Sequence, residues 1–334
     1  MARSAPLISV LMPVHNGGAY LADAVESILA QTCANFEFLI VDDASDDGAL
    51  DALPHDSRIT FMPSHGRGIV PALNTGLTAA QGEFVARMDA DDLALPERFQ
   101  AQLDHFQMHP ELGILGTQVE LFGNEGVTEG YRRYQQWVNA LTTATQIAHS
   151  IYIESPIPHP TAMVRRRLFE SLGGYRDTPW PEDYDLWLRA HLAGVHMGKP
   201  DGILLRWRDH GARLSRCDER YAVDQFVEAK ADALALSQLR NRAAIICGTG
   251  RQAVQLHRAL DKRKISITHF VDVDPRRIGG TKCGRPVIGI DHVASISRDA
   301  LLLGAVGAWN ARERLRDFFL AQDFRESVDF LMLA

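Results

Sequence analysis

The sequence predicts an α/β protein with two sheets in succession. In about the first 110 residues, short apolar runs alternate with segments whose apolar residues recur at helical spacing. Such alternation is typical of parallel strands whose connecting helices cover both faces of a sheet. The same alternation starts again near residue 243, after a long amphipathic segment. The length of 334 residues suits two domains.

Strands and helices alternate strictly at the start of the first domain. Strands are predicted at 7–12, 36–41, 58–62 and 84–88, and helices at 19–32, 69–82 and 95–109. Gly82 closes the second helix, and Pro96 lies near the first turn of the third, where proline is favoured. Ligands of parallel sheets bind at the carboxyl ends of the strands, so polar residues there are candidates for a site.

The rest of the first domain mixes the two patterns. "GILGTQVELF" (113–122) and "HPTAMV" (159–164) each predict one strand. "RRRLFESLGGYR" (165–176) predicts a short helix that its Gly-Gly pair ends. "PEDYDLWLRAHLAG" (181–194) predicts a helix that opens with acidic residues, which suit the positive end of a helix dipole.

A second, smaller α/β unit follows. Residues 218–242 predict one long amphipathic helix, and 243–260 predict a strand, a glycine turn and a helix. A strand at 265–275 ends in acids, and "RPVIGIDHVA" and "DALLLGAVG" predict two more strand ends. We therefore expect a first domain over 1–217, a helical connector over 218–241 and an accessory domain over 242–334.

Composition narrows the class of protein. The net charge of −7 and the pI of about 6.0, without a long basic run, argue against nucleic acid as the main partner. The four cysteines are scattered without a C-x-x-C pair, which argues against disulfides or a zinc site and fits a reducing cytosol. No stretch reaches the ~18 apolar residues that cross a bilayer, so any membrane contact is expected to be peripheral, at the inner face.

Three carboxylates follow the strand at 84–88. Asp89 and Asp91 have the D-x-D spacing, which in an extended segment lets both face one cation such as Mg²⁺ or Mn²⁺. A solvated turn with Asp92 as the cap of the next helix explains the same residues equally well. Like charges this close repel one another, so positive charge is expected beside them.

Polar residues also follow the first two strands. Asp42 and Asp43 come directly after the second strand and could accept hydrogen bonds from a nucleotide base or ribose. Aspartates followed by Ser and Gly are equally typical of a turn. "PVHNGG" (13–18) follows the first strand and would let backbone N–H groups approach a phosphate or base. It is not a Walker loop, because no G-K-[ST] follows.

These blocks, in this order, resemble the family 2 glycosyltransferases of the GT-A type. The resemblance covers about residues 6–215 and continues through "HPTAMVRRRLFESLGGYR", "PEDYDLWLR" and "LRWRDHGARLS". It implies a nucleotide-diphospho-sugar transferase domain with a mostly parallel central sheet. It further implies inverting sugar transfer from a nucleotide-diphosphate donor, a UDP-sugar by family habit, to a hydroxyl of a polysaccharide, glycolipid or other glycan precursor, with Mn²⁺ or Mg²⁺ as cofactor.

The resemblance also implies residue roles. The nucleoside pocket would be lined by Pro13, His15, Asn16, Asp42 and Asp43, and the nucleotide or its diphosphate would lie near Arg67, Asn74 and Arg208. Asp89 and Asp91 match the metal and ribose motif, with Asp91 the more direct ligand, and His210 could complete the metal shell. Asp183 matches the catalytic base, with Glu182 as the fallback. One base without an enzyme nucleophile implies single displacement.

The last ~90 residues contain a glycine loop. "GTGRQA" (248–253) fits G-x-G-x-x-A between a strand and a helix, with Asp272 or Asp274 at the ribose-binding distance. The region with "FVDVDPRRIGGTKCGRPVIG" resembles the small Rossmann-like domain at the front of bacterial sugar acyltransferases. That implies a module that binds a nucleotide sugar through Gly248, Gly250 and Asp272, or that serves regulation or homo-oligomer formation.

Two rival functions follow from this loop. One is a catalytically inactive nucleotide-sugar sensor that uses the accessory domain. The other is an NAD-dependent oxidoreductase, which the short length and the absence of a catalytic partner domain disfavour.

Overall fold

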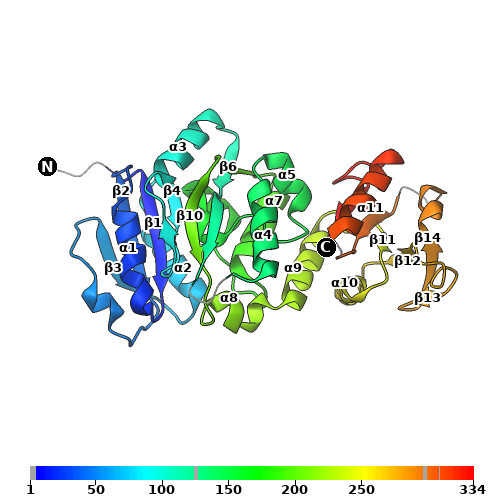
Figure 1. Cartoon of the computed structure of the whole chain (residues 1–334), viewed down its shortest axis with the longest axis horizontal. Coiled ribbons are helices and arrows are strands. Elements are labelled where there is room, and N and C mark those ends of the chain that lie inside the picture. The colour runs from blue at the N-terminus through cyan, green and yellow to red at the C-terminus, as the bar shows by residue number, and fades with distance from the viewer. Residues whose placement is uncertain (1–4, 124–126, 296–298, 308) are drawn as a thin grey trace. The chain divides into compact units, whose positions relative to one another are not determined.

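A computed structural model describes residues 5–123, 127–295, 299–307 and 309–334, which form two compact units (Figure 1). The first unit comprises Met1–Ile147, Pro156–Thr178 and Ala193–Cys217. The second comprises Ala148–Ser155, Pro179–Leu192 and Asp218–Ala334.

A seven-stranded sheet forms the centre of the first unit, in the order β3-β2-β1-β4-β8-β6-β9. Its strands are β1 (Ile8–Val14), β2 (Phe36–Asp42), β3 (Ile59–Pro63), β4 (Phe84–Arg87), β6 (Leu112–Leu115), β8 (Met163–Arg165) and β9 (His196–Gly198). β1 to β4 are parallel, β8 is antiparallel to β4 and β6, and β9 is parallel to β6. The α/β class is confirmed, and the central sheet is mixed, with four neighbouring parallel strands.

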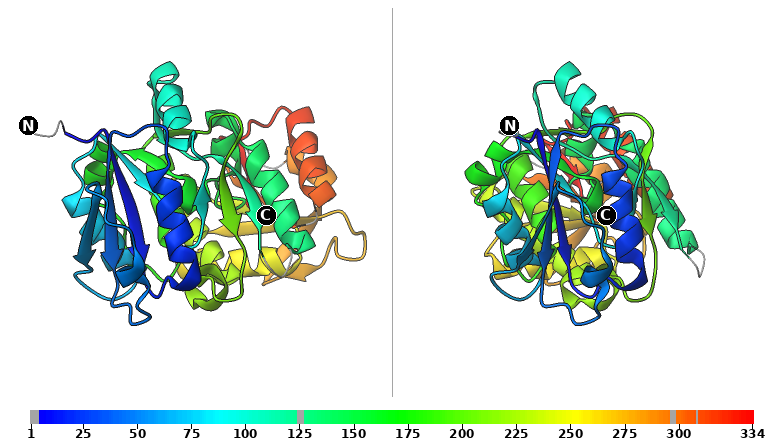
Figure 2. Two further views of the ribbon diagram at one scale, coloured as in Figure 1. Left: turned by 60° about the vertical axis from the view of Figure 1, so that its left-hand side comes forward. Right: turned by 90° about the vertical axis from the view of Figure 1, so that its left-hand side faces the viewer.

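Helices cover both faces of this sheet because its strands are apolar on both. Val10 and Met12 of β1 pack in the same core as the buried face of α1 (Leu21–Leu29). Leu11 points the other way, toward α2 (Ile69–Ala79), whose Gly76 lies so close that a Cβ there would be 2.1 Å from Leu11 Cδ1. The right view of Figure 2 shows α1, in dark blue, to one side of the strands.

A three-stranded sheet lies beside the main one in the first unit, in the order β5-β10-β7. It contains β5 (Leu93–Ala94), β7 (Gln118–Phe122) and β10 (Ile203–Arg208). The single strand predicted at 113–122 is therefore wrong, because β6 and β7 belong to different sheets. The pairing of β10 with β5 matters for the site, since it brings the end of β10 beside the chain that leaves β4.

The remaining α-helices before residue 218 are α3 (Arg98–Met108), α4 (Glu129–Ala140), α5 (Ala144–Ser150), α6 (Arg166–Leu172), α7 (Glu182–Leu192) and α8 (Leu214–Cys217), of which α7 belongs to the second unit. The short helix predicted within 165–176 is confirmed as α6, and Gly173, at φ 75°, ends it as the Gly-Gly pair predicted. The first half of the strand predicted at 159–164 is instead a 3-10 turn, His159–Thr161, before β8.

The second unit contains a six-stranded sheet in the order β13-β14-β12-β11-β15-β16, parallel except for β13 against β14. Its strands are β11 (Ala244–Cys247), β12 (Ile267–Asp272), β13 (Thr281–Lys282), β14 (Arg285–Gly289), β15 (Leu301–Gly304) and β16 (Phe330–Met332). Its helices include α9 (Val223–Leu236), α10 (Arg251–Lys262) and α11 (Trp309–Ala321).

The connector helix predicted over 218–242 is shorter in the structure. A 3-10 turn, Glu219–Tyr221, precedes α9, and the helix ends where Ser237 leaves helical geometry at φ −127° and ψ −105°. Among the described helices, none has the length and apolar character that crossing a bilayer requires.

Candidate active site

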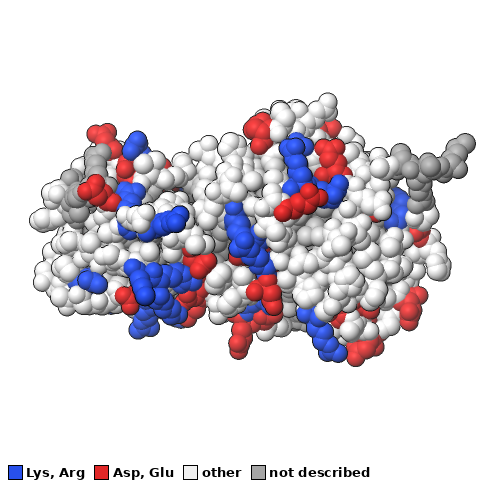
Figure 3. All heavy atoms as spheres, turned by 180° about the vertical axis from the view of Figure 1, so that it is seen from behind, with Lys and Arg blue, Asp and Glu red and all other residues white. Residues whose placement is uncertain are grey.

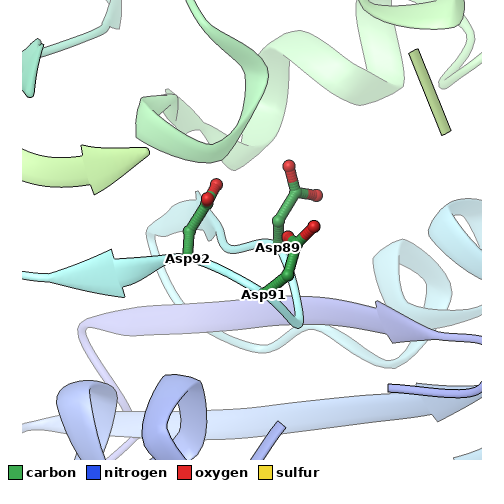
Figure 4. Close-up of side chains that lie close together, drawn as sticks. All are labelled: Asp89, Asp91 and Asp92. Carbon is green, nitrogen blue, oxygen red and sulfur yellow. The ribbon is translucent and has the colours of Figure 1, made fainter. Parts of the chain in front are cut away.

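Three carboxylates converge where the chain leaves β4. Asp89, Asp91 and Asp92 each offer a carboxylate oxygen, and these atoms all lie within 4.8 Å of one another. Figure 4 shows the three side chains on the same side of the loop. The segment is a turn at Ala90–Asp91 rather than the extended chain that the D-x-D spacing suggested. The turn lets Asp92 join the other two.

Asp92 is the most buried member of the cluster, with 0% of its surface exposed. Its Oδ1 accepts a hydrogen bond from Arg208 N at 2.7 Å, while Oδ2 has no hydrogen-bond partner among the described residues. Burial raises the pKa of Asp92 well above its usual value, and the charges of Asp91 and Asp89 add to the rise. The interpretation of Asp92 as a helix cap is wrong, because α3 begins at Arg98 with Glu97 before it.

The expected positive charge comes from the chain itself. Arg87 Nη2 donates to Asp89 Oδ1 at 2.5 Å, and Arg213 Nη2 lies 4.0 Å from Asp89 Oδ2. Burial alone would raise the pKa of Asp89, but these two guanidinium groups hold it below its usual value. Arg98 is fully buried and donates to Arg87 O at 2.8 Å, and burial lowers its pKa to about 9.

The end of β10 supplies two more contacts, both with Asp91. His210 Nε2 lies 2.8 Å from Asp91 Oδ2, and Arg208 Nε donates to Asp91 O at 2.7 Å. The Arg208 guanidinium also lies 4.3 Å from the ring centre of Tyr20 and 4.5 Å from that of Phe122, within cation–π range. The structure thus brings the "WRDH" block and the D-x-D block together.

This donor set fits a hard divalent cation. Carboxylate oxygens are the preferred ligands of Mg²⁺ and Mn²⁺. A buried carboxylate oxygen without a partner, as in Asp92, is costly unless a further group satisfies it. His210 contacts Asp91 but does not belong to the group whose ligand atoms all lie within 4.8 Å.

The residues predicted for the nucleoside pocket lie together at the ends of β1 and β2. His15 Nδ1 lies 2.7 Å from Asp43 O, and Asp43 Oδ2 accepts from Gly68 N at 2.8 Å. Asn16, at φ 54°, accepts from Asp46 N at 2.9 Å, and Pro13 pairs with Val41 inside the sheet.

Turn geometry accounts for part of this edge. Asp42 Oδ1 accepts from the backbone N of Ser45 at 2.9 Å, a local contact that ties the turn after β2. Asn74 uses its amide on the backbone of Tyr175, with Nδ2 donating to Tyr175 O at 2.9 Å and Oδ1 accepting from Tyr175 N at 3.0 Å. Arg67 is exposed in the turn before α2. The nucleotide roles of these three residues stay predictions.

The two candidate bases lie at the start of α7, in the second unit. Glu182 is 1% exposed, and both of its carboxylate oxygens accept from Tyr221 Oη, at 3.1 and 2.9 Å. Asp183 Oδ1 accepts from Tyr184 N at 2.7 Å, within the first turn of the helix.

The glycine loop of the second unit lies between β11 and α10. Gly248 has φ 121°, and a Cβ there would be 2.8 Å from Ala305 O; Gly250 directly precedes the helix. Asp272, at the end of β12, accepts from Thr249 Oγ1 and from Arg277 Nη1, the latter at 3.0 Å. The acid at the ribose-binding position is thus engaged by the chain itself.

Sequence reasoning missed the arginines at positions 87, 98 and 213 and underrated Asp92. A signal existed in Arg87, which interrupts an apolar strand and therefore needs a buried partner. Arg98 and Arg213 gave no such sign, because they stand in polar stretches of sequence.

Comparisons with known proteins identify the family and the fold. The family model for "Glycosyl transferase family 2" matches residues 9–173. The chain is 30% identical over 234 residues to the putative glycosyltransferase EpsE of Bacillus subtilis, covering 67% of this chain and 81% of that protein. It is 29% identical over 215 residues to the O-antigen biosynthesis glycosyltransferase WbnJ of Escherichia coli, covering 62% and 82%.

Among solved structures, residues 1–349 of S. aureus TarS in complex with UDP-GlcNAc give a TM-score of 0.52 at 19% identity, covering 68% of this chain and 66% of that one. Against a longer TarS chain, this chain spans 39% of the length. This likeness establishes the fold. The sequence match to EpsE and the family model establish the family: the chain belongs to glycosyl transferase family 2.

Proposed function

We propose that this glycosyltransferase moves a sugar from a UDP-sugar to an acceptor hydroxyl, with inversion, in the synthesis of a polysaccharide or glycolipid. The observation that most directly supports this proposal is the convergence of Asp89, Asp91 and Asp92 with the end of β10. Two comparisons support the donor and the pathway class: the solved TarS structure holds UDP-GlcNAc, and the E. coli relative is described as acting in O-antigen biosynthesis.

The aspartates at 89, 91 and 92 would hold Mn²⁺ or Mg²⁺. Such an ion, when bound, stabilises the negative charge that grows on a diphosphate leaving group. Arg208 adds a fixed positive charge at the same edge, because its Nε and its backbone N are already tied to Asp91 and Asp92. His210 orients Asp91 through its hydrogen bond.

Asp183 is our choice of base over Glu182. A base must come within hydrogen-bond reach of the acceptor hydroxyl whose proton it takes. Glu182 is 1% exposed, and its carboxylate shares the single hydroxyl hydrogen of Tyr221 between its two oxygens, so a buried contact already holds it and an acceptor reaches it less readily. With one base and no covalent nucleophile, the reaction is a single displacement, which inverts the anomeric carbon.

Release of nucleoside diphosphate tests this function. The wild-type chain is incubated with Mn²⁺, an acceptor glycan mixture and a panel of UDP-sugars. Asp183→Asn should reduce donor-dependent release by at least about 100-fold, in the range expected for loss of a general base. Asp91→Ala should reduce it by at least about tenfold, since a direct metal ligand contributes at least as much as an outer partner. Asp104→Asn, an exposed acid on α3, is the matched control. Full activity in either test variant would contradict the assignment of that residue.

A nucleotide-sugar sensor is the second candidate, because the loop between β11 and α10 places Gly248 at φ 121°, a backbone conformation that favours glycine, shortly before a helix. The engagement of Asp272 by Thr249 and Arg277 weighs against it. Calorimetry with a nucleotide panel separates the two. A sensor would bind in Asp91→Ala without Mn²⁺ and lose binding in Gly250→Leu, whereas the transferase would behave in the opposite way.

We also propose that the protein works at the inner face of a membrane. Residues 243–334 contain 14 Lys and Arg against 10 Asp and Glu, although the whole chain has 35 against 42. Figure 3 shows the molecule from behind relative to Figure 1, with blue Lys and Arg side chains gathered in the region of the C-terminal residues. Sedimentation with anionic vesicles, but not with neutral ones, would support this location.

A further inference from the structure

The second unit contains a pocket of about 220 Å³ that the transferase chemistry does not use. One wall is a face of α9, where Val223, Phe226, Val227 and Lys230 recur at helical spacing. The pocket runs from Val223, which is 64% exposed, to Lys230, which is 6% exposed. It therefore has an open end and a buried end.

A buried cation lies at the closed end. Lys230 Nζ donates to Ile153 O at 2.7 Å and to Leu333 O at 3.1 Å. An ammonium group carries three N–H donors, so within the described chain one donor remains for another acceptor. Burial lowers the pKa of Lys230 to about 8, against the opposing charge of Glu154. The side chain is therefore mostly charged at neutral pH.

A carboxyl group lines the same pocket. Glu154 Oε1 accepts from Ser155 N at 3.1 Å, which leaves Oε2 as an acceptor. Burial raises the pKa of Glu154, and the charge of Lys230 opposes the rise. A free anion in the pocket would meet this carboxylate, and a free cation would meet Lys230. The two charges together therefore favour an uncharged ligand that carries both donors and acceptors.

The size and the other walls define that ligand further. A volume of about 220 Å³ corresponds to roughly seven water molecules at ~30 Å³ each and is smaller than the ~300 Å³ at which drug-sized pockets begin. Phe226 gives an aromatic wall, and Gln252 and Tyr221 give an amide and a hydroxyl. A six-membered ring with several hydroxyl groups on one side and C–H bonds on its face suits this lining.

We propose that the pocket binds one uncharged, pyranose-sized sugar unit, at a site distinct from the donor site. Tyr221 lines the pocket and donates its hydroxyl to Glu182, the neighbour of Asp183 in the sequence. An occupant would thus contact the residue that holds Glu182 in place. The sugar is either a free molecule or the end unit of a glycan chain. The proposal does not depend on the catalytic roles assigned above.

Saturation-transfer NMR on the full-length Asp91→Ala variant tests the pocket while the donor site is disabled. The probes are methyl glucoside and methyl N-acetylglucosaminide, with glucuronate and glucosamine as charged counterparts. We expect saturation transfer to the neutral probes at least about three times that to either charged one. Stronger transfer to a charged probe would overturn the proposal.

Filling the pocket provides the matched comparison. Val227→Phe places a larger side chain in the pocket and should abolish transfer to the neutral probes. Leu236→Phe, at a 67% exposed position of the same helix, should leave it unchanged. Gln252→Leu serves as a second test variant if thermal unfolding shows that Val227→Phe is not folded. Unchanged saturation transfer to the neutral probes in a folded pocket variant would contradict the proposal.

Two further measurements distinguish a free sugar from the end of a glycan chain, and the pocket from the transferase activity. With a neutral disaccharide, saturation confined to the terminal ring supports binding of a chain end, and stronger binding of the methyl glycoside supports a free sugar. Nucleotide release by Val227→Phe with Asp91 restored shows whether the transferase works without the pocket. Failure of the pocket and failure of the transferase are therefore distinguishable.

Discussion

His210 Nε2 and Asp91 Oδ2 lie 2.8 Å apart, although 119 positions separate the two residues in the sequence. The antiparallel pairing of β10 with β5 brings them together, because Asp91 shortly precedes β5 and His210 follows β10 closely. Asp91 is thereby tied through its carboxylate to His210 and through its carbonyl to Arg208. The candidate site is therefore a product of sheet pairing and not of one loop.

His210→Ala should reduce nucleotide release by about 10–100-fold, because loss of a partner that orients a metal ligand has effects of this size. The measurement is donor-dependent release with saturating Mn²⁺. His55→Ala, at an exposed position of the same unit, is the control. Equal rates in the two variants would show that the contact with Asp91 has no functional part.

Asp92→Asn should weaken Mn²⁺ binding more than about tenfold, since a direct ligand contributes at least as much as an outer partner. Isothermal titration with Mn²⁺ alone measures this without substrate. The amide keeps an acceptor for Arg208 N, so the fold should persist. Asp291→Asn, an exposed acid of the second unit, should titrate like the wild type. Unchanged Mn²⁺ affinity in Asp92→Asn would remove that residue from the ligand set.

The sequence predicted the alternation of elements and the strand ends where the polar residues gather. Apolar runs that end in Asp42 or Asp89 carry that information locally. Periodicity did not separate β6 from β7, because both read as one apolar stretch while belonging to different sheets. Periodicity also did not predict that the helix after residue 218 ends at Leu236, where the backbone of the next residue, Ser237, leaves helical geometry.

The sequence could not predict which charged residues of the site are buried, because their burial depends on distant parts of the chain. The burial of Asp92 depends on its contact with Arg208, 116 positions away. The burial of Arg98 depends on carbonyl groups of Arg87 and Ala162. Charge compensation between such residues is a tertiary property, and a single sequence contains no periodic signal for it.

Gly76→Ala should lower the free energy of unfolding by about 1–3 kcal/mol, the usual range for overpacking a core. A Cβ at this position would lie 2.1 Å from Leu11 Cδ1 and 3.1 Å from Val41 Cγ2, so the buried Leu11 side chain or α2 would have to shift. Gly130→Ala in α4 is the matched control, because nothing lies within 4 Å of its Cβ position. The control should be neutral or stabilising by up to about 1 kcal/mol. Urea unfolding of both variants decides, and equal stabilities would contradict the close approach of α2.

Lys199 should make stability depend on pH. Its ammonium is buried and donates to Val138 O at 2.5 Å, and burial lowers its pKa to about 7, whereas lysine in an unfolded chain titrates near 10.4. Between these values the unfolded chain binds more protons, so the free energy of unfolding rises with pH. The cost of burying the charge is complete below about pH 7 and disappears above about pH 10.

Lys199→Met removes that cost, so its stability relative to the wild type should be highest near pH 7 and should fall as pH rises toward 10, by on the order of 1.4 kcal/mol per pH unit. Urea unfolding at pH 7, 8 and 9 measures the difference, with the exposed Lys264→Met as control. A difference that stays constant over this range would mean that Lys199 keeps an ordinary pKa in the folded chain.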